Sequence, residues 1–289
     1  MKRIIIILAL TLIGVSAFSF KAFAKDTEEK EPDFFYEVGA DLVSSYLWRG
    51  QNLGGLSIQP SVTVGWKGLY LCTWANIGAD NWRFEELNPE LDITIGYENF
   101  GFQLDLTHLY YFYGDKYFKG LTDPNNIYSG STMELHAGIN IGEWTEKIPL
   151  SIDWYTTVLG YDPVYNKYNI LEKNVNGNYK RAYSTYIQLG YDIKLPLDII
   201  LGVKVGFTPW KGMYSDYREV WTSGKTVGFN NLQLRAEREF ELKHLYINVW
   251  GDIMFNCYGV YKNNIINTFG EADSQKLNAC IGVGLYFGN

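Results

Sequence analysis

Short segments that alternate apolar and polar residues recur along most of this chain, and the connections between them alternate between short and long. Residues 90–97 read Glu-Leu-Asp-Ile-Thr-Ile-Gly-Tyr, so their apolar side chains point to one face of a strand and the others to the opposite face. After a turn at 98–101 the same pattern resumes at Phe102. A whole chain of such strands behind an export signal predicts a transmembrane β-barrel.

The first 24 residues have the three parts of a secretory signal peptide. Lys2 and Arg3 form a positive start, residues 4–20 supply an apolar stretch, and Ala22-Phe23-Ala24 is an A-x-A cleavage site. An uncleaved membrane anchor is the alternative interpretation. Export places the mature protein in a bacterial envelope.

The mature chain is acidic. Removal of Lys2, Arg3 and Lys21 leaves 22 of the 25 basic residues against 32 acidic ones, a net charge of about −10. Such a charge argues against a nucleic-acid partner. The sequence predicts an acidic flexible lead over residues 25–34 and a single barrel domain over residues 35–289.

No later stretch approaches the roughly 20 apolar residues that a membrane-spanning helix needs. The longest candidate, residues 195–207, is interrupted by Pro196, Asp198 and Lys204. Because no open sheet edge is stable in lipid, a chain of this kind can span a membrane only as a closed barrel. The predicted fold class is all-β: a single antiparallel up-and-down transmembrane β-barrel of about 12 strands.

The links between the predicted strands alternate in length. The strands are expected over residues 35–48, 57–66, 69–77, 90–97, 102–113, 132–141, 150–159, 183–193, 199–207, 228–237, 245–255 and 277–287. With both ends of the barrel domain in the periplasm, the short links become periplasmic turns and the long ones extracellular loops. A soluble sandwich or lipocalin-like barrel is the alternative, with its apolar residues inside.

Residues 40–51 read A-D-L-V-S-S-Y-L-W-R-G-Q. This run resembles the opening of the TorF-like porin family, whose first strand ends in a similar D-V-S-x-Y-x-x-R-G run. The resemblance continues through residues 59–60, 68–70 and 90–93, and so covers about residues 36–97. It implies an outer-membrane barrel that acts as a porin, and it names no substrate.

Charged side chains on the polar face of the strands are predicted to line the pore. They are Asp41, Glu90, Asp92, Asp105, Glu134, His136, Asp153, Lys204, Arg235, Glu237 and Asp252. An acidic lining concentrates cations and disfavours anions. The alternative is that these charges pair with one another and plug the barrel. Twelve tilted strands leave an opening on the order of 10 Å between inward side chains, enough for ions and small solutes.

The extracellular end carries the candidate mouth residues. Arg49 follows the first predicted strand, where it either attracts anionic solutes and lipopolysaccharide phosphates or, the favoured interpretation, caps the strand and pairs with a loop carboxylate. The loop at 160–182 is rich in Tyr and Asn, including Tyr161, Tyr165 and Tyr168. This composition suits the binding of sugars or proteins and keeps open a ligand-binding or adhesion barrel.

A barrel enzyme is the third class, because twelve-stranded barrels include a phospholipase with a Ser/His/Asn arrangement. His108 falls on the apolar face, and His244 lies in a short turn. His136 points inward, yet its strand offers no serine or cysteine nucleophile. No catalytic residue, metal site or cofactor is predicted, so the chain is not expected to be an enzyme.

Three cysteines, Cys72, Cys257 and Cys280, have no metal-type spacing and do not predict a disulfide framework. The sequence therefore predicts a bacterial outer-membrane channel for passive diffusion of ions or small solutes, with a cation bias. Its expected partners are outer-membrane lipid and lipopolysaccharide, small solutes, and the export and barrel-assembly machinery.

Overall fold

The computed structural model describes residues 33–78, 89–111, 131–160, 162–164, 172–210, 212–214, 228–261 and 274–289, without the side chains of 257–261 and 274–275. The predicted signal peptide and nearly all of the acidic lead lie outside these residues. Within them, no helix is long and apolar enough to cross a membrane.

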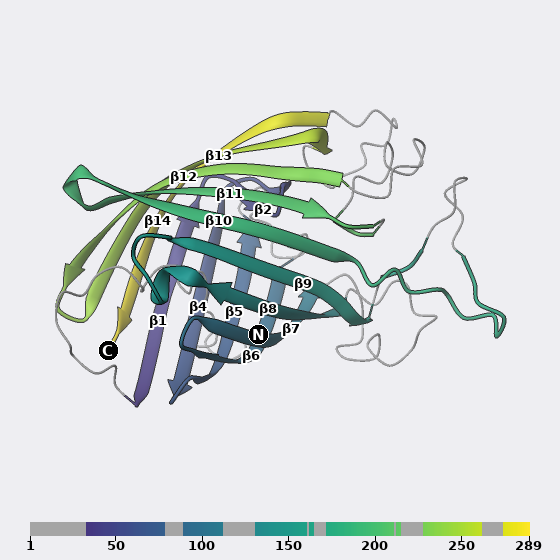
Figure 1. The fold of residues 1–289 in the computed structure, drawn as a ribbon, viewed down its shortest axis with the longest axis horizontal. Coiled ribbons are helices and arrows are strands. Elements are labelled where there is room, and N and C mark those ends of the chain that lie inside the picture. The colour runs from purple at the N-terminus through teal and green to yellow at the C-terminus, as the bar shows by residue number, and fades with distance from the viewer. Residues whose placement is uncertain are drawn as a thin grey trace, which may run out of the picture.

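Twelve antiparallel strands close into a single barrel, in the order β1-β14-β13-β12-β11-β10-β9-β8-β7-β6-β5-β4 (Figure 1). The strands are β1 Phe34–Val43, β4 Ser57–Trp66, β5 Leu69–Gly78, β6 Glu90–Asn99, β7 Phe102–Tyr111, β8 Ser131–Asn140, β9 Leu150–Gly160, β10 Thr185–Leu195, β11 Ile199–Thr208, β12 Gly228–Leu242, β13 Leu245–Tyr261 and β14 Ser274–Gly288. The barrel closes because β1 pairs with both β4 and β14; Val38, for example, lies opposite Val62 on one side and Phe287 on the other. The predicted fold class is confirmed.

Short and long links separate to opposite ends of the barrel (Figure 1). The short end has the turns at 67–68, 100–101 and 243–244. It also has the two short 3₁₀ helices η2 (Ile141–Glu143) and η3 (Pro196–Asp198). The strands that the longer links follow end at the other end of the barrel, where the described segment 172–184 projects beyond the strands (Figure 1). This is the sorting that the sequence predicts for periplasmic turns and extracellular loops.

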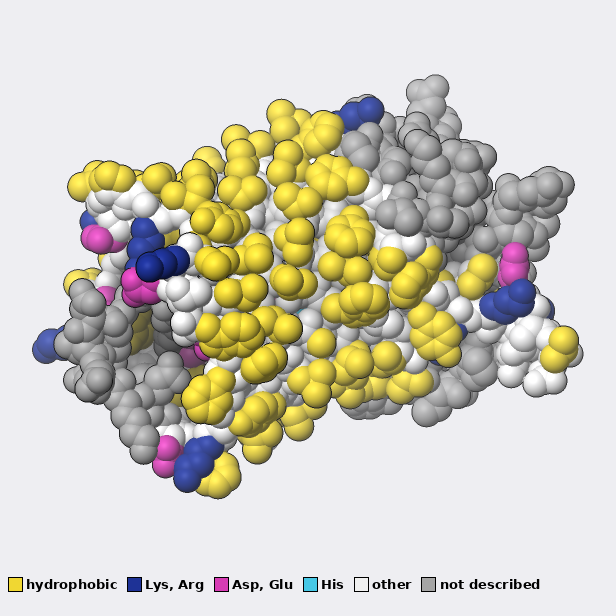
Figure 2. Space-filling view, viewed as in Figure 1, with side chains coloured by type: hydrophobic (Ala, Val, Ile, Leu, Met, Phe, Trp, Pro, Cys, Tyr) yellow, Lys and Arg dark blue, Asp and Glu magenta, His cyan; other side chains and the backbone are white. Residues whose placement is uncertain are grey.

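On the face of the barrel that Figure 2 shows, apolar side chains cover the outside, and charged ones gather toward the two ends. Ile95, Leu104 and Ile281 are 60%, 56% and 71% exposed. Aromatic residues such as Trp66 and Tyr97 lie on the outward face of the barrel, close to the ends of their strands. A soluble barrel buries its apolar face instead. Ten-residue strands tilted by roughly 40° give a belt about 25 Å tall, which matches the hydrocarbon core that outer-membrane barrels span.

The first strand is shorter than predicted. β1 ends at Val43, and residues 46–54 form a separate small hairpin of β2 (Tyr46–Trp48) and β3 (Gln51–Gly54). The physical reason lies at Ser44. Its backbone amide donates to the Ile281 carbonyl at 2.9 Å, but the Ile281 amide donates to the Ser44 hydroxyl, also at 2.9 Å, and not to a backbone carbonyl. A side chain thus replaces the backbone acceptor and ends the ladder with β14.

We call residues 46–54 the lumen hairpin, because they fold back inside the barrel instead of extending its wall. The amide of Asn256 on β13 donates to the Gly50 carbonyl at 2.9 Å, and Asn52 donates to Asn278 on β14 at 3.1 Å. Gly50 has a φ of 83°, and a Cβ there would lie 2.0 Å from the Asn230 carbonyl oxygen. Only glycine therefore fits at the tip of this turn, against the inner wall.

A second close approach supports the wall itself. Tyr186 of β10 is fully buried and lies across Gly206 of β11, where a Cβ would come within 2.0 Å of the tyrosine hydroxyl. We expect Gly206→Ala to displace Tyr186 and lower the free energy of unfolding by roughly 1–3 kcal/mol. Urea unfolding of the refolded barrel measures this change. Gly251→Ala is the matched control, because its Cβ would meet no atom nearer than 3.9 Å. Equal effects of the two substitutions would contradict the expectation.

Candidate functional site

Every residue predicted to line the pore lies on the side of its strand that faces the lumen. They are Asp41 on β1, Glu90 and Asp92 on β6, Asp105 on β7, Glu134 and His136 on β8, Asp153 on β9, Lys204 on β11, Arg235 and Glu237 on β12, and Asp252 on β13. Their part in conduction stays a prediction. The structure sorts most of them into groups joined by hydrogen bonds and ion pairs.

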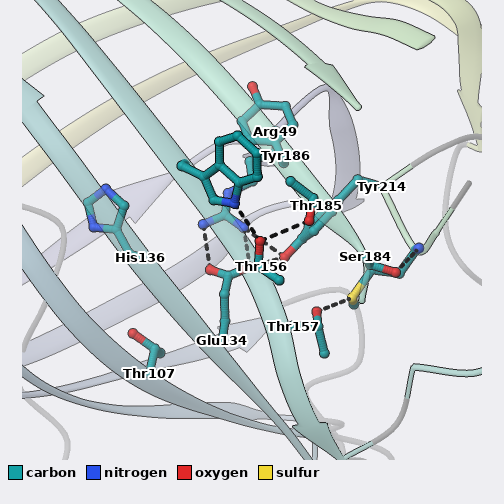
Figure 3. A network of polar contacts seen from close by, with 12 residues as sticks. Arg49, Thr107, Glu134, His136, Thr156, Thr157, Ser184, Thr185, Tyr186 and Tyr214 are labelled. Atoms are coloured by element: carbon teal, nitrogen blue, oxygen red, sulfur yellow. Dashed lines mark hydrogen bonds and ion pairs between the residues drawn. The ribbon is translucent and has the colours of Figure 1, made fainter. Parts of the chain in front are cut away.

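Arg49 is the centre of the largest group, which Figure 3 shows. It sits at the turn of the lumen hairpin and reaches the wall at Glu134. Its two terminal nitrogens lie 2.5 and 2.7 Å from the two carboxylate oxygens. Its guanidinium carbon lies 3.6 Å from the ring centre of Tyr155 and between 5.3 and 5.5 Å from those of Tyr186 and Tyr214. Such two-pronged, stacked contacts are ones that arginine makes and lysine cannot.

Tyr214 completes this group. Arg49 donates to the Tyr214 hydroxyl at 2.9 Å, and that hydroxyl donates to Glu134. The Arg49 and Glu134 side chains are only 12% and 5% exposed. Removing one partner of such a buried pair leaves the other charge without compensation. The contact therefore holds the lumen hairpin against the barrel wall.

The favoured prediction for Arg49 is wrong in its details. Arg49 does not cap the first strand, which ends earlier, and its partner Glu134 belongs to the wall strand β8 instead of a loop. It lies inside the barrel, where no anionic headgroup outside can reach it. The structural character of the role was predicted, but the partner lies 85 residues away along the chain and no local pattern links the two.

His136 forms the second group, deeper in the lumen. Its Nδ1 lies 2.7 Å from Asp105 and its Nε2 lies 3.1 Å from Asp153. The imidazole stacks on Tyr155, with ring centres 4.2 Å apart and planes 8° from parallel. Tyr155 therefore contacts both His136 and Arg49, and it connects the two groups on the inner face of the barrel.

A third group lies on β12 and β13. Arg235 Nε lies 2.9 Å from Glu237, and the same guanidinium reaches Asp252, its neighbour across the ladder, at 3.8 Å. The Arg235 guanidinium also lies over Trp250, 4.6 Å from the ring centre. This is the internal pairing that the sequence left as the alternative to an open acidic lining.

Two acids on β6 are placed differently. No described cation forms an ion pair with Glu90 or Asp92, and one buried carboxyl oxygen of each has no hydrogen-bond partner. Tyr46 of the lumen hairpin hydrogen-bonds to Glu90. Asp41, elsewhere on the wall, accepts from the Tyr286 hydroxyl. Among the described residues, Glu90 and Asp92 are thus lumen carboxyl groups without a paired cation.

A support for Tyr214 was not predicted from the sequence. The Ser184 hydroxyl donates to Asp162 and accepts from the backbone amide of Met213 at 2.7 Å. The Ser184 amide also donates to Asp162, at 3.1 Å. This chain of contacts at the outer end of β10 fixes the segment 212–214, from which Tyr214 points to the Arg49 group. Ser and Asp in a loop are too common for the sequence to have identified it.

Asp162 makes this support dependent on pH. Burial raises the pKa of its carboxyl from 3.8 to about 6, against the opposing effect of the Ser184 hydrogen bonds. Because the folded pKa lies above the ordinary value, the stability that Asp162 contributes is full below about pH 4 and is lost as the pH rises through about 6. We expect hydrogen exchange at Ser184 and Met213 to accelerate between pH 5 and 7.5 beyond the intrinsic rate. Asp162→Asn should abolish that excess, and an unchanged excess would contradict the assignment.

The remaining predicted residues fall into two sets. Tyr161, Tyr165 and Tyr168 lie outside the described residues. His108 lies on the outward face of β7, with Nε2 2.6 Å from the Ser131 hydroxyl. Ser131 is completely buried.

The thiols and possible metal ligands of the described residues form no assembled centre. Cys72 and Cys280 are free thiols, so neither takes part in a disulfide. The side chain of Cys257 lies outside the description. In the part of the chain that the structure covers, no three His, Cys, Asp or Glu side chains are arranged to hold a metal ion.

Three solved outer-membrane protein structures are similar to this chain at low sequence identity. OmpF of Salmonella typhi, in a complex with daunomycin, is 8% identical, with a TM-score of 0.34, over 89% of this chain and 97% of that one. The COG4313 outer membrane channel from Pseudomonas putida F1 is 10% identical, with a TM-score of 0.44, over 92% and 99%. Wzi of Escherichia coli, an outer membrane carbohydrate-binding barrel involved in group 1 capsule assembly, is 8% identical, with a TM-score of 0.34, over 88% and 84%.

No curated protein matches the sequence. A family model does: residues 28–255 match the model described as a bacterial protein of unknown function, Gcw_chp. This match covers most of the chain, from before β1 to within β13. The chain therefore belongs to the Gcw_chp family.

Proposed function

We propose that this protein is a narrow outer-membrane channel through which ions and small solutes diffuse passively. The observation that carries the proposal is a closed barrel with an apolar exterior and a charged lumen, into which the lumen hairpin folds. The resemblance of residues 36–97 to the TorF-like porin family points the same way. In this proposal the hairpin sets the width of the pore, and the Arg49–Glu134 pair holds it in place.

A cation bias is the second part of the proposal. Arg49, His136 and Arg235 each lie against at least one of the inward carboxylates. Glu90 and Asp92 form no ion pair with a described cation, and they face the lumen beside the hairpin. Unpaired negative charge in a narrow low-dielectric lumen attracts cations and repels anions.

Solute efflux from liposomes tests the channel directly. Refolded protein is reconstituted into vesicles that contain neutral sugars of increasing size, and efflux is measured for each. An opening on the order of 10 Å, narrowed by the hairpin, predicts that monosaccharides escape and that large oligosaccharides do not. A correctly folded barrel, judged by its heat-modifiable gel mobility, that releases no sugar and no ions would contradict the proposal.

A ligand-binding barrel is the second candidate, and one observation favours it. Residues 172–180 project from the extracellular end as an ordered arm, with Lys180 paired to Glu172 at 2.9 Å. At its tip the Asn174 side chain accepts from the amides of Asn176 and Asn178 at 3.0 and 3.1 Å. Replacing residues 174–178 by a short glycine link separates the candidates, because it removes binding to cells or glycans but leaves the efflux of a channel unchanged.

A further inference from the structure

We infer that the wall pocket now filled by Arg49 is a binding site for solutes that carry a guanidinium group. The wall pocket consists of Glu134, Tyr155, Tyr186 and Tyr214. The inference rests on the proposed channel only in that a solute must enter the lumen to reach the pocket. It adds a substrate class, for which the channel geometry alone gives no indication.

The shape of the pocket selects a flat cation with two parallel donors. Both oxygens of Glu134 are engaged, at 2.5 and 2.7 Å, by two different nitrogens of one guanidinium. The guanidinium carbon lies over Tyr155, 3.6 Å from its ring centre. An ammonium ion is a compact point charge and cannot make both contacts at once, whereas a guanidinium group pairs with a carboxylate and stacks on an aromatic ring together.

The pocket is built without the lumen hairpin. Glu134, Tyr155 and Tyr186 stand on the adjacent strands β8, β9 and β10. Tyr155 is held from its other side by the stacked ring of His136, and the Tyr186 hydroxyl accepts from Asn231 on β12 at 2.9 Å. Withdrawal of the hairpin therefore removes Arg49 and Trp48 but leaves Glu134, Tyr155 and Tyr186 on their wall strands, while the Asn230 amide still donates to the Tyr214 carbonyl at 2.6 Å.

An emptied pocket has a strong reason to take up a cation. The Glu134 side chain is only 5% exposed while Arg49 covers it, and without Arg49 its carboxylate loses the cation that compensates its charge. Aromatic rings around such a carboxylate add attraction for an organic cation. Arg49 then acts as a tethered competitor, whose effective concentration is on the order of millimolar or above. A free guanidinium solute that wins this competition also releases the hairpin, so the solute would open its own path.

Binding to the folded protein in detergent tests the inference with methylguanidinium as the probe. The competitor is removed by Arg49→Ala and, in a second variant that keeps most of the side-chain volume, by Arg49→Gln. Titration calorimetry should give a Kd on the order of 1 mM for at least one variant, and no resolved binding at that concentration for the wild type. Methylammonium and tetramethylammonium should bind at least tenfold more weakly.

The matched control removes the carboxylate as well. In Arg49→Ala with Glu134→Gln, methylguanidinium binding should weaken at least tenfold, because the bidentate partner has lost its charge. Equal binding of methylguanidinium and methylammonium, or binding that survives Glu134→Gln, would overturn the inference. These measurements need no conduction, so a barrel that binds methylguanidinium but passes no ions contradicts the channel and leaves the site intact.

Discussion

The single-channel conductance of Arg49→Ala is expected to be about twice that of the wild type, because the lumen hairpin loses its contact with the wall and the opening widens toward the bare lumen. Removing one partner of a buried ion pair costs on the order of 3–5 kcal/mol, which is large enough to release a nine-residue hairpin. The variant should also show more frequent transitions between conductance levels. Recordings in planar bilayers measure both quantities.

Two further variants locate the effect in the pair itself. Glu134→Gln should raise conductance in the same direction, and the double variant should resemble either single one, because both remove the same contact. Arg238→Ala is the control, since this arginine lies near Asp198 of η3, away from the lumen hairpin. Additive effects of Arg49→Ala and Glu134→Gln, or a conductance equal to that of Arg238→Ala, would contradict the role assigned to the hairpin.

Cation preference is expected to fall about tenfold when Glu90→Gln and Asp92→Asn are combined. The two carboxyl groups form no ion pair with a described cation. In a water-filled lumen, with an effective dielectric constant of about 80 and some screening by salt, each ionised carboxylate ~8 Å from the ion contributes roughly 0.5–1 kcal/mol to the free-energy difference between a cation and an anion. The two together contribute about 1.4 kcal/mol, which is tenfold in the permeability ratio. The reversal potential under a salt gradient gives the permeability ratio before and after the substitutions.

The control for this prediction neutralises a carboxylate outside the lumen. Glu172→Gln removes the partner of Lys180 on the projecting arm, outside the strands of the barrel wall. It should leave the permeability ratio unchanged within error. The paired acids Asp105, Asp153 and Glu237 can be neutralised together in a third variant. If that variant changes the permeability ratio more than the Glu90 and Asp92 substitutions do, then an ion pair does not cancel the effect of a lumen carboxylate on selectivity, which would contradict the prediction.

The barrel was predictable because each of its features repeats along the chain. Alternation over a strand such as residues 90–97 fixes which side chains share a face, and the lengths of the links sort the two ends. The sequence left open which face points outward. The structure resolves it, since residues such as Ile95 and Ile281 lie exposed while Glu134 is buried in the lumen.

The lumen hairpin was not predictable in the same way. Tyr46 to Trp48 continue the apolar pattern of β1, so the sequence reads as one longer strand, and only the hydrogen bond of the Ser44 side chain with β14 ends it. The Arg49 group depends on contacts across 85 residues to Glu134 and 165 to Tyr214. Such contacts follow from strand register around a closed barrel. The Arg49-Gly50 pair is the one local sign of the hairpin in the sequence. Glycine is needed at position 50 because the backbone of the turn lies against the barrel wall there.

The most direct test of the whole account is single-channel recording of the refolded wild-type protein, residues 25–289, with the reversal potential measured under a salt gradient. We expect discrete small openings with a cation preference, set by a lumen that the hairpin narrows and that Glu90 and Asp92 keep negative. A membrane that stays silent with a correctly folded barrel inserted, or openings that prefer anions, would contradict it.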